Sequence, residues 1–310
     1  MILSFVLLVI GFVLLIKGAD VFVDASSKIA MKFNVPQIVI GLTIVAFGTS
    51  APEAAVSLTA AFSGNVGITV GNIVGSNIMN VLLILGVSSL FSVLKIQKTT
   101  VKYEMPLLIF VSALMAVLGV AGNILGRLDG VILWAVFLGF FVYLIRLSKT
   151  KENEEEEELT EKDTMPRLLL LVLIGIAGIV IGSNLTVQGA TQIAEVIGIS
   201  DRIIGLTIVA FGTSLPELVT SVIAARRGKA DIAVGNIIGS NLFNILFVIG
   251  TVALIHPIPY EAAFYPDSIV CILTVVLLFL LTAKKCELDK KGGIVMLICY
   301  AAYFMHLVMA

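Results

Sequence analysis

Two glutamates, Glu53 and Glu217, stand inside long apolar stretches of the chain. Ionisable side chains at bilayer depth cost about 2.5–3.5 kcal/mol each on insertion scales and are candidates for function for that reason. Each follows a proline, in GTSAPE and in GTSLPE. Proline removes a backbone donor and displaces the carbonyl four residues earlier, so the carbonyls of Gly48 and Gly212 are expected to be freed. Such carbonyls can face a cation where an opened helix lines a cavity.

Polar residues at four-residue spacing accompany both glutamates. Thr49 lies one turn before Glu53, and Thr213 one turn before Glu217, so each pair shares a helix face. Two further sets of amide and hydroxyl side chains repeat the spacing: Asn72, Ser76 and Asn80 in the first, and Asn236, Ser240 and Asn244 in the second. Asn77 and Asn241 stand beside them and are either additional ligands or hydrogen-bond partners between helices.

This set of side chains offers oxygen donors and neither imidazole nor thiolate. Calcium takes 6–8 oxygen ligands in flexible geometry, and sodium uses the same donors, whereas zinc and copper favour nitrogen and sulfur. Two carboxylates balance the charge of one Ca²⁺, and two or more Na⁺ could occupy the same oxygens. Mutually exclusive occupancy of one site by either ion is the physical basis of antiport. The sequence gives no sign of a prosthetic group.

The surrounding sequence is that of an all-α membrane protein. Of 310 residues, 59% are hydrophobic and 13% charged, about half the charged share of a soluble chain. The first sixteen residues lack basic residues ahead of their apolar run, so we expect an uncleaved first helix. Ten segments are long enough to span a bilayer: 2–24, 36–61, 68–93, 103–122, 129–147, 166–190, 200–225, 231–255, 264–283 and 292–309.

Basic residues orient these helices. Of the 20 lysines and arginines, 17 follow odd-numbered helices. Cytoplasmic loops collect such residues, which predicts a multi-pass protein of the cell membrane with both termini extracellular. The long polar connection, 148–165, carries an acidic run from Glu154 to Glu158 and is interpreted as a cytoplasmic linker, with weak calcium sensing as the alternative. The net charge of −1 gives no indication of nucleic acid as a partner.

Residues 41–86 and 205–250 are two copies of one sequence, aligned without a gap at an offset of 164 and identical at 27 of 46 positions. The copies lie five helices apart, so the second crosses the membrane in the opposite direction. The predicted fold is therefore ten transmembrane helices in two inverted five-helix repeats, 1–147 and 166–310, joined by the linker. In such folds the ion site lies near the midplane, where the copies meet.

Other acidic residues lie near predicted helix ends and are expected to be solvated or capping groups. They are Asp20, Asp24, Glu104, Asp129, Glu195, Asp201, Asp231, Glu261 and Asp267.

The paired GTSxPE and GNIxGSNxxN motifs resemble the two α-repeats of the Ca²⁺/cation antiporter superfamily and, within it, the sodium/calcium exchangers of the prokaryotic ten-helix type. The resemblance implies alternating access, with helices 1 and 6 sliding across helices 2, 3, 7 and 8. It makes Glu53 and Glu217 the central calcium ligands, with Thr49 and Thr213 lining the site and Asn80 and Asn244 at the remaining central positions. It assigns sodium to Ser50, Ser76, Ser214, Ser240 and the carbonyls of Ala46 and Ala210. Potassium-dependent members carry Asp where this chain has Asn244, so no potassium requirement is expected.

Two alternatives to sodium/calcium exchange differ in what they require. Proton/calcium exchange would use the same carboxylates, because burial disfavours their charged form; that branch typically carries GNxxE in place of GTSxPE. An intramembrane hydrolase would need a base beside Ser50 or Ser214, and the only histidines, His256 and His306, have no counterpart in the other half. We therefore expect a transporter of Ca²⁺ and Na⁺ in the lipid bilayer and no enzyme. A single chain is sufficient for the site, and the sequence leaves the oligomeric state open.

Overall fold

The computed structural model describes residues 2–62, 66–149, 159–160, 162–196 and 210–309. Its helices follow the ten predicted segments in order, several of them divided by a bend or by a π-helical turn. The first half contains α1 (Ile2–Phe33), α2 (Gln37–Ile40), η1 (Gly41–Val45), α3 (Ala46–Thr49), α4 (Ala51–Phe62), α5 (Gly67–Met79), η2 (Asn80–Leu85), α6 (Gly86–Phe91), β1 (Leu94–Lys95), η3 (Thr100–Glu104), α7 (Met105–Gly122), β2 (Ile124–Leu125) and α8 (Arg127–Leu147).

The second half repeats this order after the linker. It contains α9 (Met165–Val196), α11 (Ala210–Thr213), α12 (Leu215–Arg226), α13 (Ala230–Phe243), η5 (Asn244–Ile249), α14 (Gly250–Ile255), β3 (Ile258–Pro259), α15 (Phe264–Thr282), β4 (Glu287–Leu288) and α16 (Lys290–Met309). Within the part of the chain that is described, seven helices are long and apolar enough to cross a membrane. They become eight if the pair Gln37–Thr49 and Ala51–Phe62, bent by 49°, is one span. The segments α11–α12 and α16 complete the ten helices of the two inverted repeats.

Two short strand pairs join segments that connect the helices. One pair links two connections that follow odd-numbered helices, and the other links two that follow even-numbered helices. β1 follows the third predicted helix and pairs antiparallel with β4, which follows the ninth. β2 follows the fourth and pairs antiparallel with β3, which follows the eighth. Odd connections thus meet odd connections and even meet even, as an alternating path of ten helices requires.

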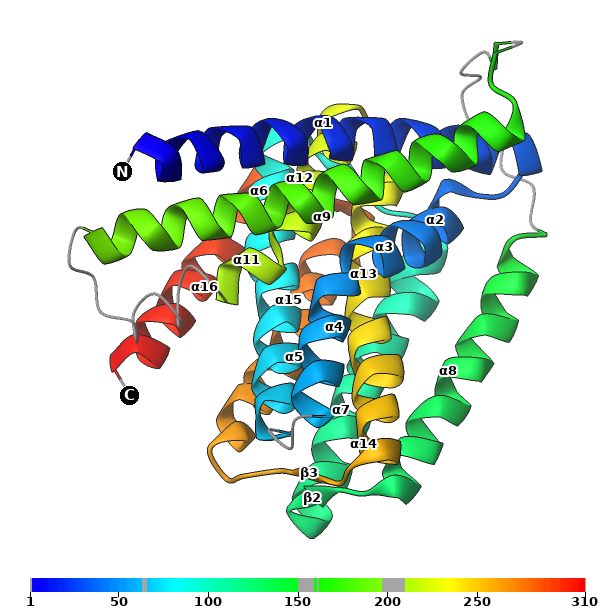
Figure 1. Cartoon of the computed structure of the whole chain (residues 1–310). Helices are drawn as coiled ribbons and strands as arrows, with labels where there is room; N and C mark the ends of the chain where they lie inside the picture. Colours follow the sequence, from blue (N-terminus) through cyan, green and yellow to red (C-terminus); the bar gives the residue numbers. More distant parts are fainter. Residues whose placement is uncertain (1, 63–65, 150–158, 161, 197–209, 310) are drawn as a thin grey trace.

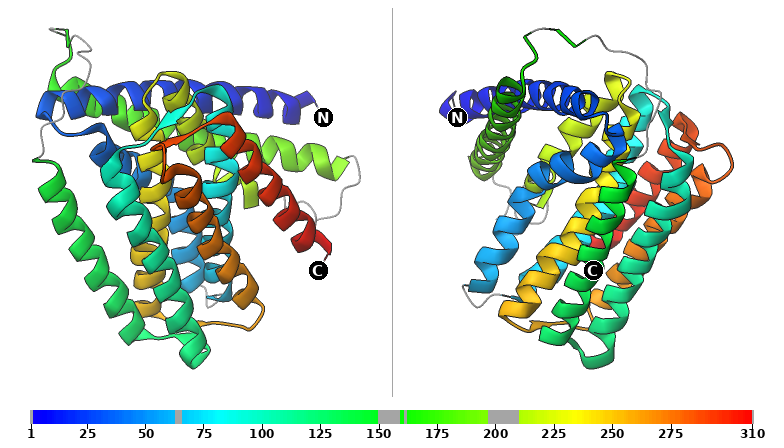
Figure 2. Two further views of the ribbon diagram at one scale, coloured as in Figure 1. Left: turned by 180° about the vertical axis from the view of Figure 1, so that it is seen from behind. Right: turned by 90° about the vertical axis from the view of Figure 1, so that its right-hand side faces the viewer.

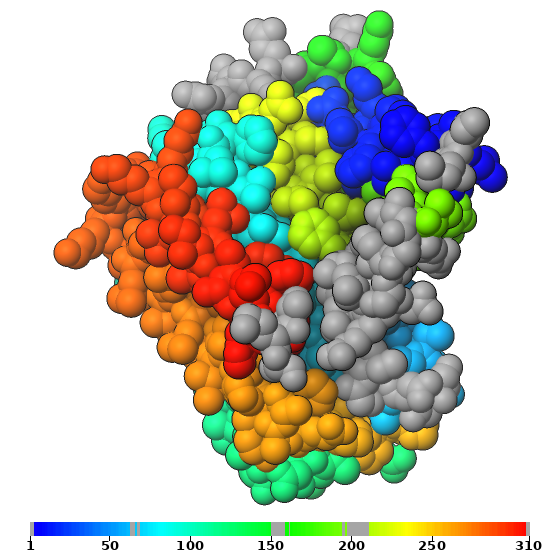
Figure 3. Space-filling view, turned by 90° about the vertical axis from the view of Figure 1, so that its left-hand side faces the viewer, coloured from blue at the N-terminus to red at the C-terminus, as the bar shows by residue number. Residues whose placement is uncertain are grey.

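The helices α1 and α9 lie side by side and cross the other helices obliquely (Figure 1). Figure 2 shows the same pair from behind and nearly end-on, at one side of the bundle. Glycines make this approach close: a methyl group added at Gly182 would lie 2.5 Å from the backbone nitrogen of Leu15, and one at Gly11 would lie 2.5 Å from that of Thr186. Small residues allow such backbone contact between membrane helices. On the face shown in Figure 3, the surfaces of α12 and α6 lie between α1 and α16.

Both oblique helices are longer than the hydropathy predicted, 32 residues each against 2–24 and 166–190. Ion pairs accompany α1 past its predicted end. Asp20 and Asp24, in the last turns of the predicted segment, form ion pairs with Arg227 at 2.5 and 3.2 Å. Lys28, beyond that segment, pairs with Asp24 at 3.1 Å and with Asp163 at 3.5 Å.

The contacts of Asp163, at the end of the linker, lead us to predict that the stability of the protein depends on pH. Hydrogen bonds from the backbone and hydroxyl of Thr160, together with the charge of Lys28, hold the pKa of the Asp163 carboxyl below its ordinary value. A lowered pKa stabilises the fold above the ordinary value of about 3.9, and this contribution is lost as pH falls through the lowered pKa. We therefore expect Asp163→Asn to lower the midpoint of thermal unfolding at pH 7. The difference from wild type should shrink below pH 4; a difference independent of pH would contradict this.

Candidate ion-binding site

Each half carries the same helix break immediately before its glutamate. α3 ends at Thr49 and α4 begins at Ala51, with Ser50 between them at φ −83° and ψ 6°. Ser214 stands between α11 and α12 at φ −91° and ψ 4°. Pro52 and Pro216 follow within the first turn of the new helix, where a missing N–H is tolerated. In the first half, the break bends the helix axis by 49°.

The two breaks face each other, and the halves exchange hydrogen bonds across the junction. The Ser50 hydroxyl donates to Glu217 Oε1 at 2.8 Å, and the Ser214 hydroxyl donates to Glu53 Oε1 at 3.0 Å. Both glutamates have no solvent-exposed surface, and their charges interact. The structure therefore brings the two carboxylates from oppositely directed halves into one buried site.

Threonine and asparagine side chains surround this centre. Thr49 donates to Asn236 Oδ1 at 2.9 Å, and a side-chain hydrogen bond joins Thr213 to Glu53. Asn72 donates to Ser57 at 3.0 Å, and Asn236 makes the equivalent bond to Ser221 at 2.9 Å. The amide groups of Asn72 and Asn236 thus connect neighbouring helices of the same half.

Backbone carbonyls play a narrower part than the proline argument predicted. The Gly212 carbonyl accepts a hydrogen bond from Ser183 at 2.8 Å, so a hydroxyl of α9 satisfies the group that proline displaces. The Ala46 carbonyl accepts from the Ser50 backbone N–H at 3.0 Å and from the Ser240 hydroxyl at 3.4 Å. Ser76 is buried. Ala210 begins α11, and its side chain lies outside the described part.

The remaining asparagines meet where α5 crosses α13. Asn80 and Asn244 are fully buried, and each begins a π-helix, η2 and η5. Their amide nitrogens donate across the junction to Asn241 Oδ1 at 2.9 Å and to Asn77 Oδ1 at 3.1 Å. Single π-helical turns are frequent at functional sites, and no feature of the sequence analysis predicted them here. The counterpart of η1 would lie at 205–209, outside the described residues.

Four buried oxygen atoms of this site lack a hydrogen-bond donor among the described residues: Glu53 Oε2, Glu217 Oε2, Asn80 Oδ1 and Asn244 Oδ1. Each half supplies one carboxylate and one amide oxygen. An acceptor left unpaired in the interior costs about 1–3 kcal/mol, and more when it is charged. Within the described chain no group of three or more His, Cys, Asp and Glu side chains could hold a metal. The oxygens that this centre offers belong to two carboxylates and two neutral amides.

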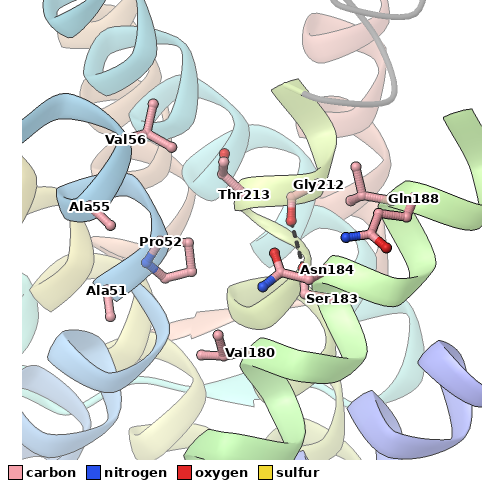
Figure 4. Close-up of a pocket in the computed structure, with 11 residues that line it drawn as sticks. Ala51, Pro52, Ala55, Val56, Val180, Ser183, Asn184, Gln188, Gly212 and Thr213 are labelled. Carbon is pink, nitrogen blue, oxygen red and sulfur yellow. Dashed lines mark hydrogen bonds between the residues drawn. The ribbon is translucent and has the colours of Figure 1, made fainter. Parts of the chain in front are cut away.

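A pocket of about 500 Å³ opens beside the glutamates, between α4, α9 and α11. Pro52, the neighbour of Glu53, lines one wall and Thr213 another, while Ser183, Asn184 and Gln188 of α9 supply polar groups (Figure 4). The residues of α4 that line the pocket belong to its first turns, and those of α9 lie in the half of that helix nearer its C-terminus.

The expectation that every other acid is solvated or capping is wrong for Glu104. This side chain has no exposed surface, its Oε1 accepts a hydrogen bond from the Tyr143 hydroxyl, and its Oε2 has no donor among the described residues. The fourth helix begins at Thr100 with η3, three residues earlier than predicted, so Glu104 lies inside the span and faces α8.

Among the other acids, Asp129 does cap α8, accepting from the Gly126 N–H at 2.7 Å. The Asp267 carboxylate accepts from Tyr303 at 3.1 Å. Asp20 and Asp24 form the ion pairs described above, and Asp231 accepts from Gln97 at 2.8 Å. Glu261 is exposed. Asp201 and the side chain of Glu195 lie outside the described residues.

The small size of Gly235 and Gly239 allows close approach between helices, since a methyl group at either would meet η1 at 3.0 and 2.7 Å. The described residues do not test such an approach at their counterparts, Gly71 and Gly75. Among these residues, a methyl group at Gly71 would meet Phe264 at 3.5 Å, and one at Gly75 would meet no atom within 4 Å. Helix 7, which would cross them by symmetry, begins in residues that are not described.

The sequence pattern of the family described as "Sodium/calcium exchanger protein" matches residues 3–146 and 167–309. The chain is 32% identical to the sodium/calcium exchanger MaX1 of Methanosarcina acetivorans, over 98% of both chains. It is 36% identical to the inner membrane protein YrbG of Escherichia coli, over 94% of this chain and 92% of that one. A solved structure of the sodium-calcium exchanger NCX_Mj, soaked with Na⁺ and Ca²⁺, superposes with a TM-score of 0.86 at 34% identity and covers 97% of each chain.

Proposed function

Since this chain belongs to the sodium/calcium exchanger family, we propose that it exchanges Na⁺ for Ca²⁺ across the cell membrane through the site around Glu53 and Glu217. Entry of several Na⁺ for each Ca²⁺ that leaves makes the exchange electrogenic. Both halves of the site come from one chain, so a monomer suffices. Ca²⁺ and Na⁺ are the transported substrates, and no prosthetic group takes part.

The four buried oxygen atoms without donors support this proposal most directly. Hydrogen-bond donors satisfy the other oxygen of each glutamate, so what remains on each carboxylate is an unpaired acceptor. With the amide oxygens of Asn80 and Asn244, these atoms form a two-fold arrangement of oxygen ligands carrying two formal negative charges. That charge matches one Ca²⁺, and flexible oxygen coordination matches its chemistry.

Sodium uses the periphery of the same site in this proposal. Ser50, Ser76, Ser214 and Ser240 and the carbonyls of Ala46 and Ala210 provide neutral oxygens around the glutamates. Because Ser50 and Ser214 already contact the carboxylates, an ion held by these hydroxyls competes with Ca²⁺ for the same charge. This competition couples the two fluxes.

Access alternates by movement of α1 and α9 as one body. The pocket beside Pro52 and Thr213 is the entrance in this conformation, and the positive-inside rule assigns its side to the exterior. The same rule places both termini outside and the linker, 148–165, in the cytoplasm. Both helices of the moving pair pack against Gly48, next to the first break: a methyl group added there would lie 3.1 Å from Phe22 of α1 and 3.2 Å from Ile176 of α9.

Calcium flux into liposomes, with one ion gradient imposed at a time, tests the proposal. An outward sodium gradient should drive Ca²⁺ uptake, and a membrane potential should change its rate. Uptake driven by a pH gradient in the absence of sodium would instead establish proton/calcium exchange at the same carboxylates. Failure of both gradients to drive calcium would reject the site as a calcium exchanger.

Because residue 244 is an asparagine, we predict that transport needs no potassium. An aspartate at this position would add a third carboxylate and a charge for a further monovalent cation to balance, whereas asparagine supplies a neutral oxygen. We expect sodium-driven Ca²⁺ uptake to proceed at the same rate when potassium is replaced by choline. Stimulation of the flux by potassium would contradict this, and Asn244→Asp is the variant in which such stimulation is expected.

A further inference from the structure

Asn77 and Asn241 bind each other's backbone where α5 and α13 cross. Asn77 Nδ2 donates to the carbonyl of Asn241 at 3.2 Å, and Asn241 Nδ2 donates to the carbonyl of Asn77 at 3.1 Å. Both side chains are 1% exposed. The two bonds are related by the repeat, and they hold the inner helices of the two halves together.

The backbone carbonyls determine how these two amides are turned. A carbonyl can only accept a hydrogen bond, so each amide must present its NH₂ group to the carbonyl and its oxygen to the opposite side. Turning either amide by 180° would bring two oxygens together and would leave a buried carbonyl without its donor, which costs about 1–3 kcal/mol. The orientation of Asn77 and Asn241 is thus fixed by atoms that cannot change role.

This orientation passes to the next pair of asparagines. Asn241 Oδ1 faces Asn80, which can meet it only with its NH₂ group, at 2.9 Å. Asn77 Oδ1 meets the NH₂ group of Asn244 in the same way, at 3.1 Å. With their nitrogens occupied, Asn80 and Asn244 turn their oxygens away from the asparagine network, and these are two of the four buried oxygens without donors.

We infer that Asn77 and Asn241 are positioning residues that turn the side-chain oxygens of Asn80 and Asn244, and not their NH₂ groups, toward the cation. The inference rests on the proposed role of Asn80 and Asn244 as ligands. An NH₂ group carries partial positive charge and would repel a cation. An amide that is free to rotate by 180° could therefore present its NH₂ group to the cation in place of its oxygen, and it would then weaken binding. Each ligand is oriented from the other half of the chain, and separation of α5 from α13 would release both amides together.

Calcium affinities of purified variants, measured by isothermal titration calorimetry, test the inference through double-mutant cycles. Asn77→Ala leaves the Asn241 amide bound to the backbone of residue 77 but releases Asn244, and we expect affinity for Ca²⁺ to fall about tenfold or more. In the Asn244→Asp background the same change should alter affinity by less than about twofold, because both carboxylate oxygens are acceptors in either orientation. In the Asn80→Asp background the full loss should remain.

The matched control is the mirror cycle. Asn241→Ala should lose its effect in the Asn80→Asp background and keep it in the Asn244→Asp background. Should Asn77→Ala fail to fold, the Asn241→Ala cycle measures the same coupling from the other half of the chain. An Asn241→Ala loss that persists unchanged in the Asn80→Asp background would overturn the inference.

The outcomes separate this inference from the proposed function. Equal losses for Asn77→Ala in all three backgrounds would show a purely structural role and overturn the inference, while leaving the site intact. Unchanged calcium affinity in both Asn80→Ala and Asn244→Ala would show that these oxygens do not bind calcium, which removes the proposed ligand set itself.

Discussion

Replacing Glu53 with glutamine is expected to abolish sodium-driven calcium uptake. The substitution keeps the shape of the side chain and an oxygen for the Ser214 hydroxyl, but it removes one of the two buried charges that balance Ca²⁺. Removing one partner of a buried, charge-paired set costs about 3–5 kcal/mol, which corresponds to more than about a hundredfold in affinity. Glu217→Gln should have the same effect, because Ser50 holds Glu217 as Ser214 holds Glu53. Liposome flux and calorimetry with purified protein measure the two consequences.

Glu104→Gln is the matched control for this experiment. Glu104 is another glutamate with no exposed surface, and it also has one oxygen bonded to a hydroxyl and one without a donor. It lies on η3 against α8, and it has no contact with the two breaks in the described structure. We expect Glu104→Gln to retain calcium affinity. Intact uptake in Glu53→Gln, or equal losses in all three variants, would contradict a calcium site at the paired glutamates.

Sequence reasoning came closest where lipid dictates the structure. A bilayer permits spans whose backbone is satisfied internally, so the ten apolar segments correspond to the observed helices, and α15 lies within about a residue of its prediction. The prediction was short where polar contacts replace lipid. Beyond the predicted segment, Lys28 of α1 forms an ion pair with Asp163, a partner that lies far away in the sequence.

For the site, the sequence predicts which residues take part, but it does not predict how they contact one another. Spacing along one helix predicts which side chains share a face, as Thr49 and Glu53 do. It says nothing about which face of another helix stands opposite. Each serine at a break donates a hydrogen bond to the glutamate of the other half, and the asparagines pair across the same junction. Both sets of bonds join residues more than 160 positions apart. Only the packing of the two halves reveals them.

The repeat also hides a difference between the halves. Phe243 and Phe247 flank Asn244, stacked with their ring centres 4.7 Å apart, and they contact Phe47 and Trp134 at 4.7 and 5.2 Å. The corresponding neighbours of Asn80 are Met79 and Leu83. Rigid aromatic rings therefore support one ligand helix and flexible aliphatic chains the other. The residue types were visible in the sequence, but their place behind the site was not.

Replacing Gly182 with alanine is expected to lower both stability and transport, because Gly182 lies in the close contact between α1 and α9. Alanine normally stabilises a helix relative to glycine by about 1 kcal/mol. At Gly182, however, the added methyl group would lie 2.5 Å from the backbone nitrogen of Leu15 and 2.7 Å from the carbonyl oxygen of Gly11. Backbone atoms cannot turn aside as a flexible side chain can, so α1 must move away from α9. Overpacking of this kind typically costs about 1–3 kcal/mol, so Gly182→Ala is expected to destabilise the protein instead of stabilising it.

Gly139 of α8 provides the comparison, because a methyl group there meets none of the described atoms within 4 Å. We expect Gly139→Ala to raise the midpoint of thermal unfolding slightly and to leave calcium transport unchanged, and Gly182→Ala to lower both. Calcium affinity of solubilised Gly182→Ala should remain close to that of wild type, since residue 182 does not contact the glutamates. If the two helices move as one body, loosening their contact slows transport without weakening binding. A Gly182→Ala protein that transports at the wild-type rate despite reduced stability would show that the close contact serves folding alone.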